Sequence, residues 1–385
     1  MKLQSLSENF KRGVLTTEKI IGKNLTLPIL SNILLEAEKG QLKVSATNLE
    51  IGAVCFLRAK IEREGKIAIP GRVIGGYLGN IPDGSKMTIE VKNQILYLVS
   101  QGNQAAIKGF NAKDFPIIPK PQSKYLLEIN SLVFRNSVTK VISSAALSET
   151  RQELTGVYFS LEKDKLVLAA TDSFRLAEAS IKFNKGDNEA SGYQKFISKT
   201  PFFIVPAKTL QEVIRSISEE TEKLKIYISE SQIFFEIGET IFVSRLIDGK
   251  YPEYKQVIPK EFLSSIFVDR ENLIKAVRTA SIFSDSKSRE VKIHVKGNED
   301  KIKVESQSVE TGENITKVNA QVNMKGENII AFNNRYLIDA LNSLFSETAY
   351  IGFNDSFGPV IFREVQEKNK LNEDYLHILM PMRSW

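Results

Sequence analysis

Imidazole and thiol side chains, which often carry acid–base or metal chemistry, are few in this sequence. Its 385 residues include two histidines, His294 and His377, and a single cysteine, Cys55. Each histidine lies in a stretch of alternating polar and apolar residues that is typical of a β-strand, where a structural role is far commoner than general-base catalysis. Cys55 has apolar neighbours and is interpreted as a small buried hydrophobe. We therefore predict no metal site and no internal disulfide.

Phosphate chemistry is also poorly supported. Gly71-Arg-Val-Ile-Gly-Gly76 is rich in glycine but lacks the lysine of a nucleotide-binding loop. The remaining catalytic hypothesis is a repeated-domain enzyme of nucleic-acid metabolism with Glu153, Asp172 and Asp248 as its acids. A second alternative is a monomeric scaffold of three domains. We predict instead a protein with no catalytic residues and no cofactor.

The charge balance does not favour a protein that coats nucleic acid by bulk attraction. The sequence has 52 basic and 46 acidic residues, a net charge of +6 and 42% hydrophobic residues. A weak, salt-sensitive hold on phosphates would need the basic residues gathered on one surface. The sequence does not begin like a signal peptide, and no apolar run approaches the roughly 18 residues of a membrane span. We expect a cytoplasmic protein.

Basic residues recur on six segments with helical periodicity. A solvated helix face is the commoner fate of such charges. The residues are Lys11, Arg12, Lys19, Lys23, Arg72, Arg135, Lys140, Lys208, Arg215, Lys275, Arg278 and Arg335.

The elements that carry these residues form a unit that occurs three times. Thr47, Thr171 and Gln307 end three similar strands, and they are spaced by 124 and then 136 positions. Each unit is predicted to run helix, strands, helix, strands, in domains at residues 1–124, 125–262 and 263–385. The strands are too short for parallel crossovers, so we predict an α+β fold with helices on one face of antiparallel sheets. Helices are predicted over 8–23, 72–80, 131–146, 208–217, 271–283 and 333–344, and a solvated loop over 184–194.

Three further motifs are Arg151 with Glu153-Leu-Thr-Gly-Val157, Thr171-Asp-Ser-Phe-Arg-Leu176 and the C-terminal Met380-Pro-Met-Arg383. Together they resemble the bacterial DNA polymerase sliding clamps, the beta subunits of polymerase III, over essentially the whole chain. The resemblance implies that two chains close head to tail into a ring around duplex DNA and perform no bond chemistry. Helices would line the hole and point Lys and Arg at phosphates, so that binding is non-specific. The implied partners are the replicative polymerase, repair polymerases and an ATP-driven clamp loader.

The resemblance also implies a cleft between the second and third domains that binds short peptides with apolar and aromatic anchors. Phe174 stands where relatives often have His, Gln256 where Arg is common, and Asn24 and Leu25 where an Arg often precedes Thr-Leu-Pro-Ile-Leu. The matching cleft residues are Arg151, Thr171, Ser173, Phe174, Arg175, Leu176, Pro252, Val257, Tyr336, Phe357, Pro359, Ile378, Leu379, Met380, Pro381, Met382 and Arg383.

The ring seam is the third expectation from the resemblance. It places Ile107 and Phe110 of one chain against Ile282 and Phe283 of the other. Such a seam is heterologous, and it closes because three domains in each chain complete half a turn. The alternative is that these apolar residues only cap their local cores.

Overall fold

A computed structural model describes residues 1–22, 27–38, 40–184, 193–199, 202–229, 231–297, 299–367 and 370–383. The chain folds into two compact units. The first contains residues 1–135, 183–196 and 208–246, and the second contains residues 136–182, 197–207 and 247–385. No described helix is both long enough and apolar enough to cross a bilayer.

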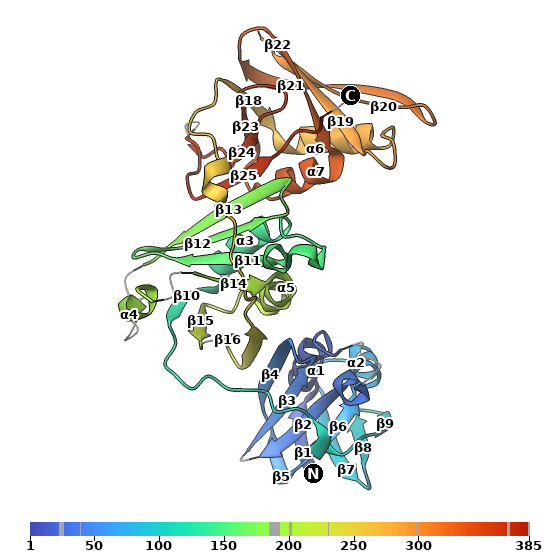
Figure 1. The fold of residues 1–385 in the computed structure, drawn as a ribbon. Helices are drawn as coiled ribbons and strands as arrows, with labels where there is room; N and C mark the ends of the chain where they lie inside the picture. The colour runs from blue at the N-terminus through green and yellow to red at the C-terminus, as the bar shows by residue number, and fades with distance from the viewer. Residues whose placement is uncertain are drawn as a thin grey trace. The chain divides into compact units, whose positions relative to one another are not determined.

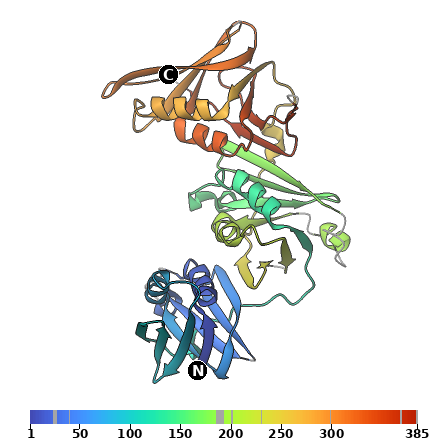
Figure 2. The same ribbon diagram turned by 180° about the vertical axis from the view of Figure 1, so that it is seen from behind.

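The described residues form seven α-helices, and six of them coincide with the predicted amphipathic segments (Figures 1 and 2). They are α1 (Ser7–Glu18), α2 (Gly71–Gly79), α3 (Ser131–Ile142), α4 (Tyr193–Ile197), α5 (Ala207–Ser216), α6 (Arg270–Ser281) and α7 (Asn334–Asn342). Four short 3-10 turns are η1 (Pro28–Ser31), η2 (Ala112–Asp114), η3 (Glu149–Thr155) and η4 (Tyr254–Val257).

The predicted solvated loop over 184–194 requires a correction. Residues 185–192 lie outside the described residues. Tyr193 is buried and begins α4, and its ring packs edge-on against Phe183. An aromatic ring of this size stabilises the fold by leaving water, so this end of the segment is part of the core.

Two antiparallel sheets form the first unit (Figure 1). One has the order β5 (Lys60–Arg63), β1 (Lys2–Leu6), β7 (Lys86–Lys92), β8 (Ile95–Ser100), β9 (Asn103–Lys108). The other has the order β10 (Leu127–Asn130), β15 (Lys223–Ile228), β16 (Gln232–Ile237), β17 (Thr240–Arg245), β4 (Ile51–Arg58), β3 (Gln41–Thr47), β2 (Asn32–Glu38), β6 (Gly65–Pro70).

A single twelve-stranded sheet runs through the second unit, and α6 packs against its strands β20 and β21. Its order is β14 (Phe202–Pro206), β11 (Gly156–Leu161), β12 (Lys165–Thr171), β13 (Arg175–Lys182), β25 (Tyr375–Leu379), β24 (Val360–Glu364), β23 (Thr348–Phe353), β18 (Ser264–Asp269), β21 (Gly312–Asn323), β20 (Lys301–Ser308), β19 (Glu290–Lys296), β22 (Glu327–Asn333). The strand pairs described for these sheets are all antiparallel, as predicted.

The sheets continue from one sequence repeat into the next. In the first unit β17 pairs with β4, and in the second unit β25 pairs with β13. We call these pairings the first and second junctions. Each one hydrogen-bonds the last strand of one repeat to an inner strand of the repeat before it, so no backbone edge is left between the repeats.

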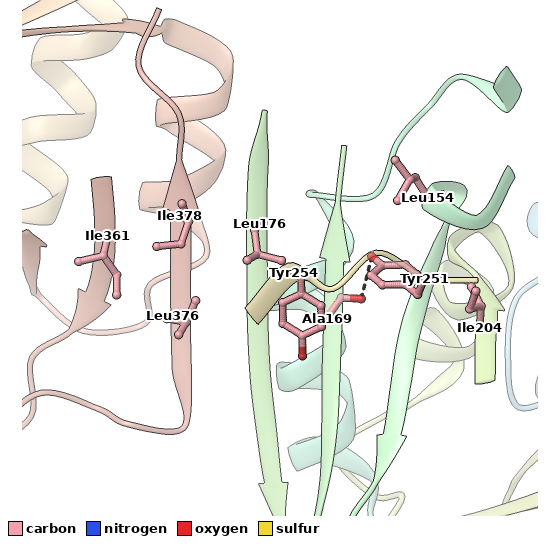
Figure 3. Close-up of a cluster of buried hydrophobic side chains, with 9 residues drawn as sticks. All are labelled: Leu154, Ala169, Leu176, Ile204, Tyr251, Tyr254, Ile361, Leu376 and Ile378. Carbon is pink, nitrogen blue, oxygen red and sulfur yellow. Dashed lines mark hydrogen bonds between the residues drawn. The ribbon is translucent and has the colours of Figure 1, made fainter. Parts of the chain in front are cut away.

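Buried apolar side chains lie on both sides of the second junction (Figure 3). Leu376 and Ile378 on β25 and Leu176 on β13 belong to one cluster, and Tyr251 and Tyr254 cover the face of β12 and β13. The full cluster is Leu154, Ala169, Leu176, Ile204, Tyr251, Tyr254, Ile361, Leu376 and Ile378. The Tyr251 hydroxyl donates to the carbonyl of Ala169 at 3.4 Å, which satisfies a polar group inside this core.

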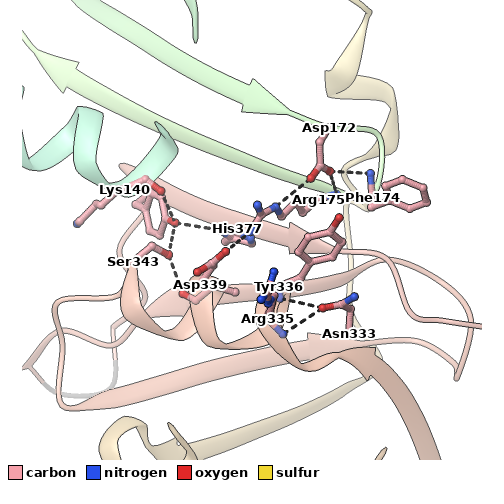
Figure 4. Close-up of polar contacts among 12 residues, drawn as sticks. Lys140, Asp172, Phe174, Arg175, Asn333, Arg335, Tyr336, Asp339, Ser343 and His377 are labelled. Carbon is pink, nitrogen blue, oxygen red and sulfur yellow. Dashed lines mark hydrogen bonds and ion pairs between the residues drawn. The ribbon is translucent and has the colours of Figure 1, made fainter. Parts of the chain in front are cut away.

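A polar network crosses the second junction beneath this core (Figure 4). Lys140 on α3 forms an ion pair of 2.7 Å with Glu364, and its ammonium lies 4.7 Å from the centre of the Phe345 ring and 5.0 Å from that of Tyr375. Figure 4 shows Lys140 beside Ser343 and His377. The Tyr375 hydroxyl donates to Ser343 at 2.6 Å and lies 3.2 Å from Nδ1 of His377. Glu364 and the two rings compensate the Lys140 charge, whereas Nε2 of His377 is buried with no hydrogen-bond partner among the described residues.

His377 gives this network a dependence on pH. Its ring is fully buried, and burial, with a smaller effect of the Arg175 charge, lowers the pKa of His377 to about 3. An unfolded histidine has a pKa of about 6.5. Below that pH the unfolded chain binds a proton that the folded chain does not bind, so this group destabilises the fold as the pH falls from about 6.5 towards 3.

We predict that His377→Phe removes this contribution. Phe242 is buried at the equivalent position of the first junction, opposite Ala53 as His377 is opposite Ala177, so a phenylalanine suits the site. Between about pH 7 and about pH 4.5, the wild type should lose about 2 kcal/mol more unfolding free energy than the variant. Urea unfolding at both pH values measures this difference. An identical pH dependence of the two proteins would contradict it.

Candidate docking surface, basic helices and edge strands

The turn between β12 and β13 fixes the backbone of the predicted peptide site. The Thr171 hydroxyl donates to the carbonyl of Arg175 at 2.7 Å and accepts the N–H of Ser173 at 3.1 Å. The Asp172 carboxylate accepts the N–H groups of Phe174 and Arg175, both at 3.0 Å. Ser173 has a φ of 77°, a left-handed conformation that the surrounding hydrogen bonds stabilise. The result is a Phe174 side chain that is 61% exposed.

Arg175 has a different role from the predicted one. It is only 8% exposed, its Nε donates to Asp172 at 3.1 Å, and its Nη1 lies 2.5 Å from the carboxylate of Asp339 on α7. Its guanidinium stacks 4.3 Å from the ring centre of Tyr336 (Figure 4). Because two carboxylates of the chain already use its donors, Arg175 joins the second and third repeats and is not free to bind a peptide backbone.

Phe174, Tyr336 and Met380 lie together, and we call these three residues the Phe174 surface. The rings of Phe174 and Tyr336 face each other with their centres 6.4 Å apart, and the N–H of Met380 donates to the carbonyl of Phe174 at 2.9 Å. The N–H of Met382 donates to Ala331 at 2.7 Å, which holds the C-terminal segment against β22. The exposed Phe174 ring, beside the half-buried ring of Tyr336 and a methionine, is an adaptable apolar contact for a partner.

The other predicted cleft residues differ in accessibility. Val257 and Phe357 are exposed, and the Arg151 guanidinium donates to Glu153 at 3.0 Å. Pro252, Pro359 and Pro381 are half-buried, and Arg383 is exposed. Three predicted residues are corrected, because Leu176, Ile378 and Leu379 are buried in the core and can only support the surface from beneath.

The predicted basic residues fall into three groups. Exposed side chains are those of Arg12, Lys19, Arg72, Lys208, Arg215, Lys275, Arg278 and Arg335. Lys11 and Arg135 are half-buried, with Lys11 paired to Asp83 at 3.3 Å and Arg135 donating to the carbonyl of Ile217 at 3.3 Å. Lys140 is corrected, because its side chain is 13% exposed and bound to Glu364. Lys23 lies outside the described residues.

The seam residues are likewise unequal. Phe110 is 52% exposed and Ile282, just after α6, is 69% exposed, which leaves two large apolar side chains in water. Phe283 is half-buried. Ile107 on β9 is buried within its own unit, so its side chain supports the local core and does not lie open for a partner.

Several side chains that could support catalysis are paired or buried. No three His, Cys, Asp or Glu side chains among the described residues are arranged to hold a metal ion. Asp172 and Glu153, two of the three acids of the enzyme hypothesis, are engaged with Arg175 and Arg151. Burial raises the pKa of the Cys55 thiol to about 11, so it is not a nucleophile near neutral pH. Burial also lowers the pKa of His294, which lies 3.0 Å from Glu305.

Two features of the site were missed by sequence reasoning. Asp339 anchors Arg175, and its only sequence signal was a carboxylate on the predicted helix over 333–344, which also carries Arg335. The free edges of β9 and β21 were also missed. β9 ends its sheet, and residues Gly312–Lys317 of β21 pair with β20 on one side only among the described strands. Neither strand is marked by composition, because an edge is a property of the assembled sheet.

The fold and these surfaces define a three-domain clamp protein, in which helices cover antiparallel sheets. Family models for the N-terminal, central and C-terminal domains of the DNA polymerase III beta subunit match residues 1–119, 128–253 and 255–383. The chain therefore belongs to the DNA polymerase III beta subunit family.

Similar proteins span the same length. The beta sliding clamp of Synechocystis is 28% identical over 397 residues, covering 100% of this chain and 99% of that protein. The beta sliding clamp of Bacillus subtilis is 25% identical, with 100% of both chains covered. The crystal structure of a sliding clamp from Bartonella birtlesii, bound to griselimycin, has a TM-score of 0.89 and 26% identity, again with full coverage of both chains.

Proposed function

We propose that this chain is a processivity factor of DNA replication. Two copies close head to tail into a ring around duplex DNA, in the cytoplasm, and hold the replicative polymerase and other replication and repair proteins through short peptides. The chain performs no catalysis, and a separate ATP-driven loader opens the ring. Its three domains occupy residues 1–124, 125–262 and 263–385. The observation that carries the proposal is the pair of free edges on β9 and β21.

β9 and β21 occupy the same places in their repeats as the strands that pair at the first and second junctions. The repeat therefore predicts a third junction between them. β17 and β25 are the last strands of the second and third repeats, and each pairs with an inner strand of the preceding repeat, β4 or β13. β9 is the last strand of the first repeat, and β21 is the inner strand of the third. Among the described residues no strand of another repeat extends the sheet beyond β9, and a second copy would supply that strand. Pairing in both directions between two copies closes a ring.

The two junctions also supply the register of the third. His377 lies opposite Ala177 and Phe242 opposite Ala53. The hairpin registers make Ala105 of β9 equivalent to Phe242 of β17, and Asn314 of β21 equivalent to Ala53 of β4. Ala105 of one copy would therefore lie opposite Asn314 of the other. Ile107 then lies opposite Gly312, two residue pairs further along. The exposed Phe110 and Ile282 lie near the ends of the same seam and would leave water on closure.

We predict that Ala105→Cys combined with Asn314→Cys gives a covalent dimer on mild oxidation. Directly opposed residues of an antiparallel pair have Cα atoms about 4.5–5.5 Å apart, which suits a disulfide. Non-reducing electrophoresis measures the product, and the buried Cys55 should not compete. Ala105→Cys with Lys317→Cys is the matched control, because that pair is out of register. Equal cross-linking of both pairs would contradict the register.

The exposed basic residues on the helices support the DNA part of the proposal. Arg12, Arg72 and Lys208 lie on three helices of the first unit, and Lys19 directly follows the first of them. Lys275, Arg278 and Arg335 lie on two helices of the second unit. Side chains spread over many helices contact phosphates without reading bases, which suits sliding. Lys140 takes no part, since it stabilises the second junction.

We predict that the hold on DNA is topological. The cross-linkable dimer is incubated with nicked circular plasmid, oxidised, and passed through a sizing column at high salt. Salt screens phosphate contacts, so only encirclement retains the protein. Cutting the plasmid once should release it. Release from circular and cut plasmid to the same extent would refute encirclement, and DNA cleavage that is lost on Asp172→Ala would favour the enzyme alternative.

The Phe174 surface supports the peptide part of the proposal. It offers an exposed ring, a second ring beneath it and a methionine on a terminal segment tied to the fold by backbone hydrogen bonds. Burying one such apolar anchor contributes about 1.5–3 kcal/mol before ordering costs. A few anchors of this strength give affinities that allow partners to exchange.

We predict that Phe174→Ala weakens binding of a fluorescent peptide from the cognate polymerase by about tenfold or more, in line with the loss of one buried ring. Deleting Met380–Trp385 should abolish binding and leave the dimer intact. Ile117→Ala is the control, because Ile117 is a fully exposed apolar residue outside this surface. Fluorescence anisotropy gives the affinities. Unchanged affinity of both altered proteins would remove the assignment.

A further inference from the structure

The first junction contains a cavity. It has a volume of about 770 Å³ and lies in the first unit, where α1 and the end of β4 meet β15 to β17 and the segment after α5. We call it the α1 cavity. Its volume is within the range of small-ligand sites in proteins.

The repeat identifies what should fill this space. α1 and α3 begin and end 124 residues apart, so Thr16 is equivalent to Lys140. Thr240 pairs with Cys55 as Tyr375 pairs with Ala179, so Thr240 is equivalent to Tyr375. Ile237 lies opposite Thr240 in its hairpin, as Glu364 lies opposite Tyr375 by the register of β24 and β25, so Ile237 is equivalent to Glu364. Ser218 lies 11 residues after the start of α5, as Phe345 lies 11 residues after the start of α7, so Ser218 is equivalent to Phe345.

In the second junction these four positions enclose a primary ammonium group. The Lys140 ammonium lies 2.7 Å from the Glu364 carboxylate and near the faces of Phe345 and Tyr375. In the first junction the equivalents are Thr16, Ser218, Ile237 and Thr240, and all four line the α1 cavity. The cavity therefore exists because an amine, its carboxylate and two rings have been replaced by smaller, uncharged side chains.

The charges around the cavity favour a cation. Five glutamates line it against three basic residues, Arg12, Lys223 and Lys225. Each basic residue already has a glutamate partner, namely Glu239, Glu128 and Glu236. Glu220 and Glu222 are exposed at the lining, and no basic side chain of the described residues forms an ion pair with either. An anion would meet this excess of negative charge, whereas an ammonium group would be attracted.

The walls also suit an alkyl stem. Phe56, Leu57 and Ile237 contribute apolar surface, and Thr16 and Thr240 contribute hydroxyl groups that can accept a hydrogen bond from an ammonium. A lysine stem buries its methylene groups on apolar surface while its charged end seeks polar partners. The second junction of the same chain shows this arrangement with Lys140.

We propose that the α1 cavity binds a primary alkylammonium group, with its stem on the apolar wall and its charge towards Glu220 and Glu222. The group comes either from a lysine side chain of a partner protein or from a free diamine. The site is separate from the Phe174 surface and does not depend on the proposed function.

Calorimetric titration of the full-length protein at low ionic strength tests the proposal. The probes are 1,5-diaminopentane and Nα-acetyl-lysine methylamide, which represent the two sources, and neutral 1,5-pentanediol is the control of equal length. We expect saturable millimolar binding of at least one amine, weakened by salt, and no binding of the diol. Amine binding no stronger than diol binding, or no amine binding at all, would overturn the proposal.

Two variants locate the binding. Thr16→Lys with Ile237→Glu rebuilds the ion pair of the second junction inside the cavity and should reduce amine affinity at least tenfold. Glu220→Gln with Glu222→Gln alters only exposed side chains and should reduce it severalfold, which keeps the test valid if the first variant does not fold. The matched control is Glu347→Gln with Glu373→Gln, two exposed glutamates that do not line the cavity. Affinity unchanged in the cavity variants, or lowered equally in the control, would refute the site.

Discussion

The backbone of an edge strand must find hydrogen-bond partners, and this constraint organises the whole molecule. The chain meets it twice internally, by pairing β17 with β4 and β25 with β13. The same pairings bring helices and turns of neighbouring repeats together, which creates the Lys140 network, the Phe174 surface and the α1 cavity. All three are consequences of where strands pair and of which side chains happen to occupy the junction.

The repeats share a backbone and differ in the chemistry placed on it. The Thr47 turn has the same hydrogen bonds as the Thr171 turn, and Leu49 has the same φ of 77° as Ser173. Yet Thr209, buried and bonded to Ser244, stands in the first junction where Tyr336 stands in the second. One junction therefore presents aromatic rings to solvent, and the other does not. The two junctions therefore differ in their side chains, although the backbone conformation of the turn is the same in both.

Periodicity and repetition were sufficient to predict the helices, the antiparallel sheets and the order of elements. The turn motif and the C-terminal motif indicated the docking surface, because both are local in sequence. Arg175 shows the limit of such reasoning. Whether a guanidinium is free or neutralised depends on Asp339, more than 160 residues away, and burial of Lys140 depends on Glu364 in the same way. Helix boundaries also differed, since Ile20 folds into a turn stabilised by Thr17 and does not continue α1.

A head-to-tail contact has no built-in limit on the number of subunits that it joins. If β9 of each copy takes the β21 edge of the next, only the curvature of the chain decides between a closed particle and an open fibre. Closure of the last contact is intramolecular and so benefits from a high effective concentration. In such a ring, the Lys140–Glu364 ion pair across the second junction would help to fix that curvature and so oppose polymerisation.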